Sequence, residues 1–221
     1  VWFSSVVLEA EDAPAELRKI PARFGDGPRP AEALTAPLKD VEKLGDDGRA
    51  CRPLPGGSLA GAVALVQRGG CSFALKVFNA ENAGAVAVVI YQLDGVEAIF
   101  SPAGLAGSSI PAVMIPDSAG KQLKSFLAGN PEARVTLDPT LTAWEAPADE
   151  MAVFSSRGPS IGEYGIKPEV VAVGTDLFTA TQRYDPNSEL WDPTGYTAVD
   201  GTSFAVGLAA GAAALVKQRK P

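Results

Sequence analysis

Residues 61–92 read GAVALVQRGGCSFALKVFNAENAGAVAVVIYQ, and the order of the first clear elements follows from this stretch. Its opening apolar run is typical of a buried strand, and this strand ends in a tight turn at Arg68-Gly69-Gly70. Ser72 is placed to cap a helix. The apolar face of that helix consists of residues three or four apart: Phe73, Val77, Ala80 and Gly84. Gly84 also ends the helix, and AVAVVIYQ is predicted to be a second buried strand.

The sequence after this stretch continues the alternation. A Gly/Ser/Pro loop, SPAGLAGSS, precedes the short strand IPAVMIP at residues 110–116. Asp117 is then expected to cap a helix that Gly129 ends, and ARVTLDP supplies a further strand. Residues 61–138 therefore predict an α/β or α+β module around one core. The Pro- and Ala-rich residues 139–149 look like its exit linker, and residues 1–50 suggest short strands and irregular loops.

The chain has two cysteines, Cys51 and Cys71. A disulfide between them would close a loop of about 20 residues and stabilise the fold by about 3 kcal/mol. Two buried free thiols are the alternative, because two cysteines in one region do not establish the redox compartment.

Composition excludes several classes of function. The 221 residues are 46% hydrophobic and 20% charged, as in an ordinary globular chain of one or two domains. A formal charge of −7 disfavours nucleic acid and anionic lipid as partners. The longest apolar stretch, residues 204–216, is too short to span a bilayer. The chain contains no histidine, so it lacks the commonest general base, and a zinc site is not expected.

The start of the chain indicates that it is part of a longer protein. Val1-Trp2-Phe3-Ser4-Ser5 lacks an initiator methionine and the basic region of a signal peptide. We therefore expect further sequence upstream of Val1.

The same central stretch, followed by SIPAVMIP, resembles the protease-associated (PA) domain family over roughly residues 35–138. Its most specific part is Arg68-Gly69-Gly70-Cys71-Ser72-Phe73 together with residues 76–84. The resemblance implies an α+β fold with a β-sandwich or barrel-like core and flanking helices, which with its flanking segments would occupy residues 1–145. It also implies a lid or docking surface that limits which protein or peptide substrates reach a catalytic cleft.

Two later stretches, MAVFSSRGPSIGEYGIKPEVVAVGTDLFTA and YTAVDGTSFAVGLAAGAAALV, resemble the C-terminal part of a subtilisin-like serine protease domain. The resemblance rests on the SSRGP, KPE and GTS signatures in their usual order. It implies that residues 146–221 are a C-terminal fragment of the α/β subtilisin-like fold. In that family a PA domain is commonly inserted before the serine, so the upstream part would carry the Asp, the His and an oxyanion Asn. It also implies a secreted or cell-surface location.

By this resemblance Ser203 corresponds to the catalytic nucleophile. It stands where an apolar helix begins, and a helix N-terminus favours the negative charge that develops during attack on a carbonyl. The alternative is that Ser203 only caps the helix. The residues that follow are apolar on every side until Lys217, which indicates a helix buried in a core whose partners are mostly absent here. We therefore expect residues 150–221 to pack on the PA module, dimerise or swap between chains.

Without a histidine to activate it, Ser203 should not hydrolyse peptides in this chain alone. Lys217 is no substitute, because it lies about 20 Å along the helix at 1.5 Å per residue. Gly207 and Leu208 replace the family's usual Pro and His, and Val173 replaces the Pro of a VAPG segment. These departures motivate an alternative: a non-catalytic PA binding module of a pseudoprotease.

The remaining candidates are weaker. The loops at Asp46-Asp47-Gly48 and Asp185-Pro186-Asn187 offer clustered oxygens, but neither has the spacing of a known calcium loop, and solvated turns explain them as well. No metal or cofactor is therefore assigned to this chain, and structural calcium in the full-length protein is left open. Single exposed cations and isolated tryptophans carry no specific role: Arg157, Lys167, Trp144 and Trp191.

Overall fold

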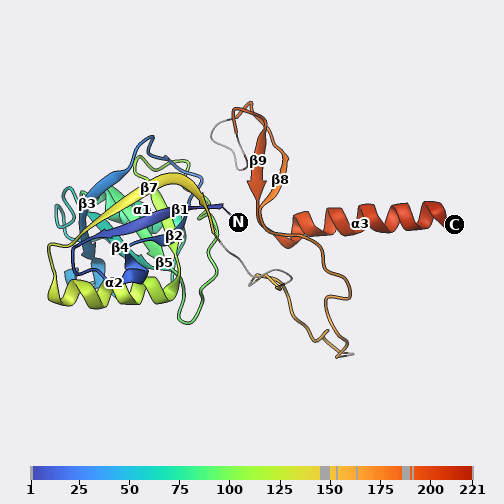
Figure 1. Cartoon of the computed structure of the whole chain (residues 1–221), viewed down its shortest axis with the longest axis horizontal. Helices are drawn as coiled ribbons and strands as arrows, with labels where there is room; N and C mark the ends of the chain where they lie inside the picture. The colour runs from blue at the N-terminus through green and yellow to red at the C-terminus, as the bar shows by residue number, and fades with distance from the viewer. Residues whose placement is uncertain are drawn as a thin grey trace. The chain divides into compact units, whose positions relative to one another are not determined.

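The computed structural model describes residues 2–144, 150–152, 154–162, 164–185, 190 and 192–220. The chain divides into two compact units, Val1–Glu145 and Ala146–Pro221 (Figure 1). Each unit is described by itself.

Seven strands of the N-terminal unit form a closed barrel in the order β1-β2-β6-β5-β4-β3-β7, among the residues described. The strands are β1 (Trp2–Glu9), β2 (Ile20–Phe24), β3 (Leu34–Asp40), β4 (Val63–Gln67), β5 (Ala87–Tyr91), β6 (Ala112–Ile115) and β7 (Arg134–Ala143). The helices are α1 (Phe73–Asn82) and α2 (Asp117–Gly129), with 3-10 turns η1 (Ala15–Leu17) and η2 (Val41–Leu44). The barrel-like core with flanking helices that the resemblance implied is therefore confirmed.

The pairs β3–β4, β4–β5 and β5–β6 are parallel. The other pairs, including β3–β7 and β2–β6, are antiparallel. Val63 lies opposite Ala87, and Val88 lies opposite Ala112, so the strands of the predicted module pair side by side. The predicted order of strand, helix, strand, strand, helix, strand over residues 61–138 is confirmed.

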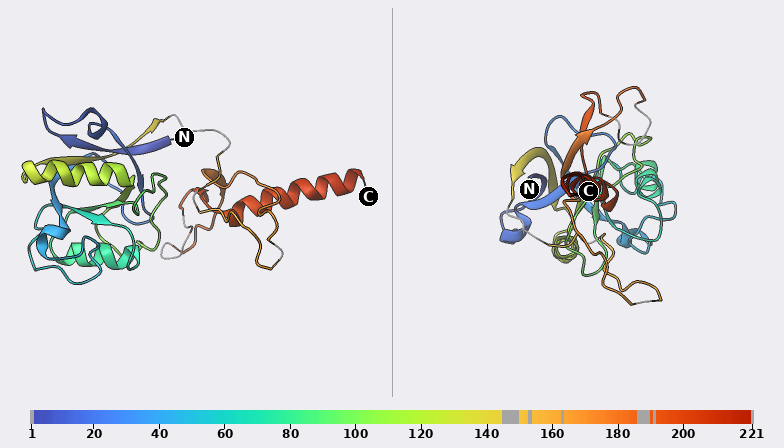
Figure 2. Two further views of the ribbon diagram at one scale, coloured as in Figure 1. Left: turned by 90° about the horizontal axis from the view of Figure 1, so that it is seen from below. Right: turned by 90° about the vertical axis from the view of Figure 1, so that its right-hand side faces the viewer.

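Both faces of these parallel strands are buried. Leu65 and Val89 face one apolar cluster, which α2 joins through Leu123, whereas Val66 and Ile90 face a second cluster on the α1 side. Figure 2 shows the two helices on different sides of the parallel strands. A strand covered on both faces has no polar side, which explains why GAVALVQ and AVAVVIYQ are unbroken apolar runs.

Helix α1 begins and ends as its residues predict. The Ser72 hydroxyl oxygen accepts a hydrogen bond from the N–H of Leu75 at 3.3 Å. At the other end Gly84 has a φ of +95°, and a Cβ there would lie 3.0 Å from the Cα of Ala60. Glycine is therefore required at this helix end by both its conformation and the close approach of the neighbouring backbone.

The predicted cap of α2 is wrong. Pro116 occupies the N-cap position, and Asp117 is the first helical residue. The carboxylate of Asp117 instead accepts the N–H of Gly95 at 2.7 Å and pairs with Lys121 at 2.8 Å. Pro116 has an extended conformation that is compatible with a helix start. Because Asp117 is not the cap, its buried carboxylate can join α2 to the loop after β5.

The exit linker expected at residues 139–149 is partly wrong, because residues 139–143 belong to β7. Thr142 pairs with Phe3 and Asp138 pairs with Ser5, and the register shifts between these two pairs. Pro139 lies within this irregularity, where a residue without an N–H is tolerated. Pairing with β1, a partner far away in sequence, makes this Pro-containing stretch a strand.

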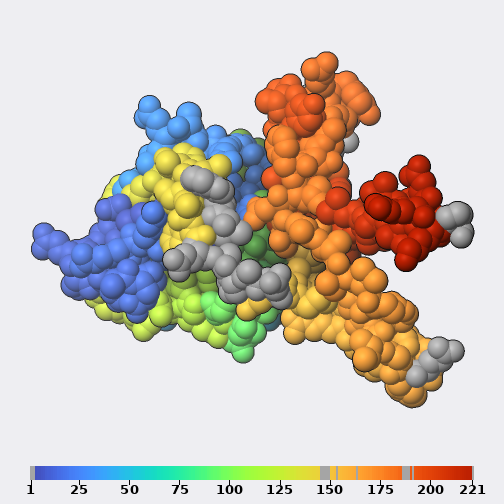
Figure 3. Space-filling view, turned by 45° about the vertical axis from the view of Figure 1, so that its right-hand side comes forward, coloured from blue at the N-terminus to red at the C-terminus, as the bar shows by residue number. Residues whose placement is uncertain are grey.

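The C-terminal unit contains an antiparallel pair, β8 (Leu177–Ala180) and β9 (Tyr196–Val199), followed by α3 (Thr202–Arg219). No residue of α3, drawn in red in Figure 3, is buried. Its exposed side chains include Val206, Leu208, Leu215 and Val216. The burial in a core that the apolar sequence of α3 indicated is therefore not seen in this chain. In the described residues this unit has no larger sheet against which such a helix would pack.

Candidate functional site

Ser203 lies in the first turn of α3, and its side chain is exposed. Gly201 occupies the N-cap position, Thr202 is the first helical residue and Ser203 is the second. No side chain caps this helix end. The alternative interpretation of Ser203 as the helix cap is therefore wrong: the cap is a glycine, and the serine hydroxyl is available for another role.

Two hydrogen bonds hold the turn before Ser203 in place. The N–H of Gly201 donates to the carbonyl of Gly174 at 2.7 Å. The N–H of Asp176 donates to the carboxylate of Asp200, also at 2.7 Å. The segment before β8 and the segment after β9 are thus joined at the base of the hairpin.

The backbone of Gly174 lies close to the start of α3. A Cβ on Gly174 would lie 3.3 Å from the Cβ of Ala205 and 3.3 Å from the carbonyl oxygen of Gly201. The structure therefore brings Gly174, the last residue of the Val171-Ala172-Val173-Gly174 segment, against the turn that carries Ser203. A larger residue at Gly174 would displace that turn.

The electrostatics of this helix end favour negative charge. The backbone N–H groups of Phe204 and Ala205 both donate to the carbonyl of Gly201. The first N–H groups of a helix have no intrahelical acceptor, and Gly201 has no side chain to supply one. An anionic oxygen near Ser203 would therefore meet the N–H groups of Thr202 and Ser203, the first two of the helix, and the positive end of the helix dipole.

The chain offers no histidine to take a proton from Ser203. Lys217 lies near the opposite end of the same continuous helix, so it cannot reach Ser203. The carboxylate of Asp200 is engaged with the backbone of Asp176. What this chain supplies is therefore a positioned hydroxyl and a polar helix end, without the group that would activate the hydroxyl.

The SSRGP and KPE segments meet in the C-terminal unit. A Cβ on Gly158 would lie 3.1 Å from the backbone nitrogen of Lys167. Lys167 forms an ion pair with Glu169, which is two residues away in the chain. The Lys167 side chain is thus engaged locally, and neither it nor Arg157 is brought to Ser203 by any contact among the residues described.

The other candidates from the sequence have structural explanations. Asp46 accepts the N–H groups of Arg49 and Ala50 at 2.8 and 2.7 Å, so its carboxylate stabilises a turn. The Lys19 ammonium lies 5.4 Å from the ring centroid of Trp144. Trp191 and the loop at Asp185-Pro186-Asn187 fall at least partly outside the described residues. Within the described residues no group of three or more Asp, Glu, Cys or His side chains is arranged to hold a metal.

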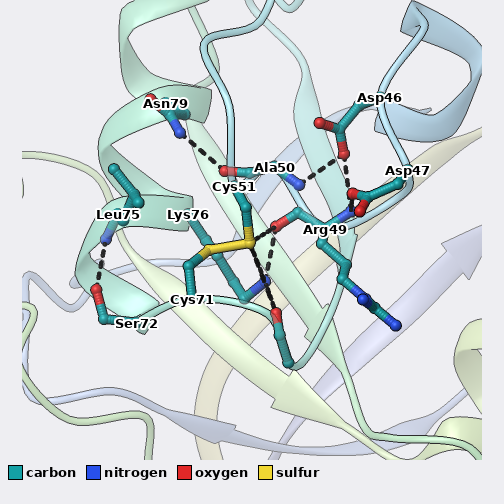
Figure 4. Close-up of a disulfide and its surroundings, with 11 residues drawn as sticks. Asp46, Asp47, Arg49, Ala50, Cys51, Cys71, Ser72, Leu75, Lys76 and Asn79 are labelled. Atoms are coloured by element: carbon teal, nitrogen blue, oxygen red, sulfur yellow. Dashed lines mark hydrogen bonds between the residues drawn. A yellow bond between two sulfur atoms is a disulfide. The ribbon is translucent and has the colours of Figure 1, made fainter.

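Cys51 and Cys71 form a disulfide, which joins the segment before β4 to the start of α1 (Figure 4). The fully buried Lys76 lies beside it, and its ammonium donates to the carbonyls of Arg49 at 2.7 Å and Gly69 at 2.6 Å. Burial lowers the pKa of Lys76 to about 8, with a smaller contribution from the nearby Arg49 cation.

The sequence interpretation missed the inward orientation of Lys76. A signal was present, because Lys76 lies three residues after Phe73 and four before Ala80, on the inner face of α1. Asn79 also points inward and donates to the carbonyl of Ala50 at 2.9 Å (Figure 4). The buried face of α1 is thus mixed, with Lys76 and Asn79 beside the apolar Val77 and Ala80.

The comparisons with known proteins agree with the barrel unit. Residues 30–123 match the sequence profile of the PA domain family. The chain therefore contains a PA domain. Strands β3, β4, β5 and β6 lie within the matched residues, and β1, β2 and β7 lie outside them and complete the closed barrel. Within the described residues, no helix has both the length and the hydropathy required to cross a membrane.

The chain is similar to several proteases. It is 35% identical over 185 residues to the minor extracellular protease Vpr of Bacillus subtilis, which covers 83% of this chain and 22% of that protein. It is 28% identical to the subtilisin-like protease SBT1.4 of Arabidopsis thaliana, covering 80% of this chain and 24% of that protein. The chain thus spans less than a quarter of the length of these two relatives.

Among solved structures, a zinc aminopeptidase from Bacillus subtilis matches with a TM-score of 0.46 and 23% identity. The match covers 64% of this chain and 30% of that structure.

Proposed function

We propose that this chain is the PA domain and nucleophile-bearing segment of a secreted subtilisin-like serine endopeptidase, with Ser203 as the nucleophile. The observation that carries the proposal is the exposed Ser203 hydroxyl on an uncapped helix turn that Gly174 and Asp176 hold in place. Supporting it, the alignment with Vpr covers more residues than the N-terminal unit has, so it includes part of the C-terminal unit.

In the proposed reaction Ser203 Oγ attacks the carbonyl carbon of a peptide bond while a histidine from the upstream sequence takes its proton. The C–N bond then breaks, the histidine gives the proton to the leaving amine, and an acyl-enzyme remains. Water attacks the ester through the same base and releases Ser203. The N-terminal end of α3 stabilises the oxyanion, together with an upstream Asn. Protein groups alone carry these steps, so no cofactor is proposed.

Because the histidine comes from the upstream sequence in this proposal, the 221-residue chain should be inactive by itself. The PA domain would act on protein substrates outside the catalytic step, as a surface that selects among them. The disulfide and the extracellular relative both support a secreted or cell-surface location.

The test uses the full-length protein that contains this segment. Ser203→Ala is expected to lower peptidase turnover by at least about a thousandfold, because the covalent route is lost. Ser101→Ala, an exposed serine in the N-terminal unit, is the matched control and should retain activity. A fluorophosphonate, which labels activated serines, should modify Ser203 in the full-length protein but not in the isolated chain. Undiminished turnover by Ser203→Ala would overturn the assignment.

The second candidate is a non-catalytic PA binding module of a pseudoprotease. The observation that favours it is the continuous course of α3 through Gly207 and Leu208, where the family usually has Pro and His. The upstream sequence discriminates between the two candidates. A pseudoprotease would lack the Asp and His pair there, and no fluorophosphonate adduct would form on Ser203.

A further inference from the structure

Helix α1 of the PA domain exposes apolar side chains on its outer face, although its buried face is partly polar. Its buried face includes Lys76 and Asn79, whereas Leu75 and Phe78 point outward with 39% and 57% exposure. A helix on the surface of a domain normally buries its apolar stripe and exposes its polar one. Adjacent exposed apolar residues on an otherwise ordinary surface are typical of an interaction site.

The outward stripe of α1 forms one wall of a groove, and the loop at residues 104–108 forms the other. The groove has a volume of about 410 Å³, which is within the range of ligand-binding clefts. Most of its lining residues are apolar or glycine, and three are polar. The lining residues are Ser72, Ala74, Leu75, Phe78, Glu81, Gly104, Leu105, Gly107 and Ser108.

Both walls are fixed in place before any ligand arrives. Lys76 and Asn79 fasten the inner face of α1 to the segment at residues 49–50. On the other side, the carboxylate of Asp26 accepts the N–H groups of Gly104 and Leu105, each at 2.8 Å. The Leu105 side chain is itself buried, with 1% exposure. A preformed groove spares a ligand the entropic cost of ordering its walls.

The loop wall carries little side-chain bulk. A Cβ added to Gly104 or to Gly107 would find no heavy atom within 4 Å, so open space lies in front of this backbone. An extended peptide can therefore approach this wall closely while its side chains turn toward Leu75 and Phe78.

One end of the groove is acidic. Glu81 lies one helical turn after Phe78 and accepts a hydrogen bond from the hydroxyl of Ser109. Within the described part of the chain, Glu81 has no basic partner. A cationic side chain on the same face of a ligand as an apolar one would complement this arrangement.

We propose that this groove binds an extended peptide that places an aliphatic side chain against Leu75 and Phe78 and a Lys or Arg two residues further along at Glu81, because residues two apart share one face of an extended chain. The inference deepens the proposed substrate-selecting role of the PA domain by naming the peptide class that it selects. Peptide binding requires no catalysis, so this proposal would still hold if Ser203 proved not to be a nucleophile.

The test measures fluorescence polarisation of labelled octapeptides with the full 221-residue chain. The peptide Gly-Ser-Gly-Leu-Gly-Lys-Ser-Gly, called the Leu-Lys peptide, should bind about tenfold more tightly than the versions with Ser in place of Leu or Glu in place of Lys. Glu81→Lys should reverse the preference, so that the Leu-Glu peptide binds better than the Leu-Lys peptide. Equal binding of all three peptides, or an unchanged preference in Glu81→Lys, would overturn the proposal.

Two matched pairs of variants locate the site. Gly107→Leu fills the groove and should weaken the Leu-Lys peptide by at least about tenfold, whereas Gly56→Leu, also in open space, should leave binding unchanged. Phe78→Ala should weaken binding, and Leu141→Ala, exposed to 52%, should not. Thermal melts check that each variant is folded. If Gly107→Leu binds like wild type, or converts a dimer of this chain to monomer in light scattering, the groove does not serve this peptide.

Discussion

The ammonium nitrogen of Lys76 lies 3.6 Å from the sulfur of Cys51, on a side chain that is completely buried. The same nitrogen donates to carbonyls in the two segments that the Cys51–Cys71 disulfide connects. A covalent link and a buried cation therefore fasten the same corner of the PA domain (Figure 4). This corner supports α1, whose outer face lines the proposed peptide groove.

Removing the disulfide should destabilise the N-terminal unit. For a closed loop of about 20 residues, the unfolded chain gains conformational freedom worth about 3 kcal/mol. We expect the double variant Cys51→Ser/Cys71→Ser to lose that amount of unfolding free energy and to unfold at a lower urea concentration. Wild type kept in a reducing agent is the control and should match the variant. A double variant as stable as the oxidised wild type would show that the link contributes nothing.

Lys76 should make stability depend on alkaline pH. Its pKa is about 8 in the folded protein, below the ordinary value of 10.5, so between these values the unfolded chain binds more protons. The free energy of unfolding should therefore rise with pH across that window, by about 3 kcal/mol in total. Below pH 8 both states carry the charge, and the stability is at its lower level.

Urea unfolding just below pH 8 and near pH 10.5 measures this rise. Lys76→Met, which keeps the length of the side chain but cannot titrate, should lose the rise whatever its absolute stability. Arg49, Asp46 and Asp47 are the charged groups near Lys76, and they are unchanged in that variant. A rise of the same size in both proteins would assign it to other groups.

Asp26 should hold the loop wall of the groove. Its two carboxylate oxygens accept the N–H groups of Gly104 and Leu105, so Asp26→Ala leaves two amides without their acceptor. We expect a loss of about 1 to 3 kcal/mol in unfolding free energy and faster hydrogen exchange at both amides. Asp26→Asn keeps one acceptor oxygen and should lie between the two. Unchanged exchange at Leu105 in Asp26→Ala would contradict this role.

Gly120 should be the glycine of α2 that cannot be replaced. A Cβ there would lie 2.2 Å from the Cβ of Tyr91, so α2 packs on β5 through bare backbone. Gly120→Ala is expected to cost about 1 to 3 kcal/mol because the helix must move away from the strand. Gly129 is in the same helix with no atom within 4 Å, and Gly129→Ala should be neutral or slightly stabilising. Urea midpoints of the two variants give the comparison.

The part of the fold that could be predicted is the part with local causes. The runs around Leu65 and Val89 are apolar because both faces of parallel strands are buried, and Ser72 and Gly84 mark the helix between them. Closure of the barrel could not be predicted, because it depends on pairs such as Phe3 with Thr142 at opposite ends of the unit. No local pattern specifies such a partner.

The same distinction applies to the candidate site. The start of α3 at Thr202, one residue before Ser203, follows from local sequence, including Gly201 at the N-cap. The assignment of Ser203 as a nucleophile depends on groups that this chain does not contain, so it stays a prediction. The spacing of Lys76 along α1 predicts that its side chain points inward. A lysine is so rarely buried without a carboxylate partner, however, that the residue type argues against this prediction.

Asp200 should position the proposed nucleophile. Its carboxylate accepts the N–H of Asp176, which ties the end of β9 to the start of β8 three residues before Ser203. If the proposed function holds, Asp200→Ala in the full-length protein should lower kcat about tenfold or more with little change in KM, because the turn loosens. Asp200→Asn retains an oxygen acceptor and should recover most of the activity. Asp192→Ala, which removes a carboxylate that bonds only within the far turn of the same hairpin, is the matched control and should leave kcat unchanged. Equal kcat values for Asp200→Ala and wild type would show that the turn holds its shape without this bond.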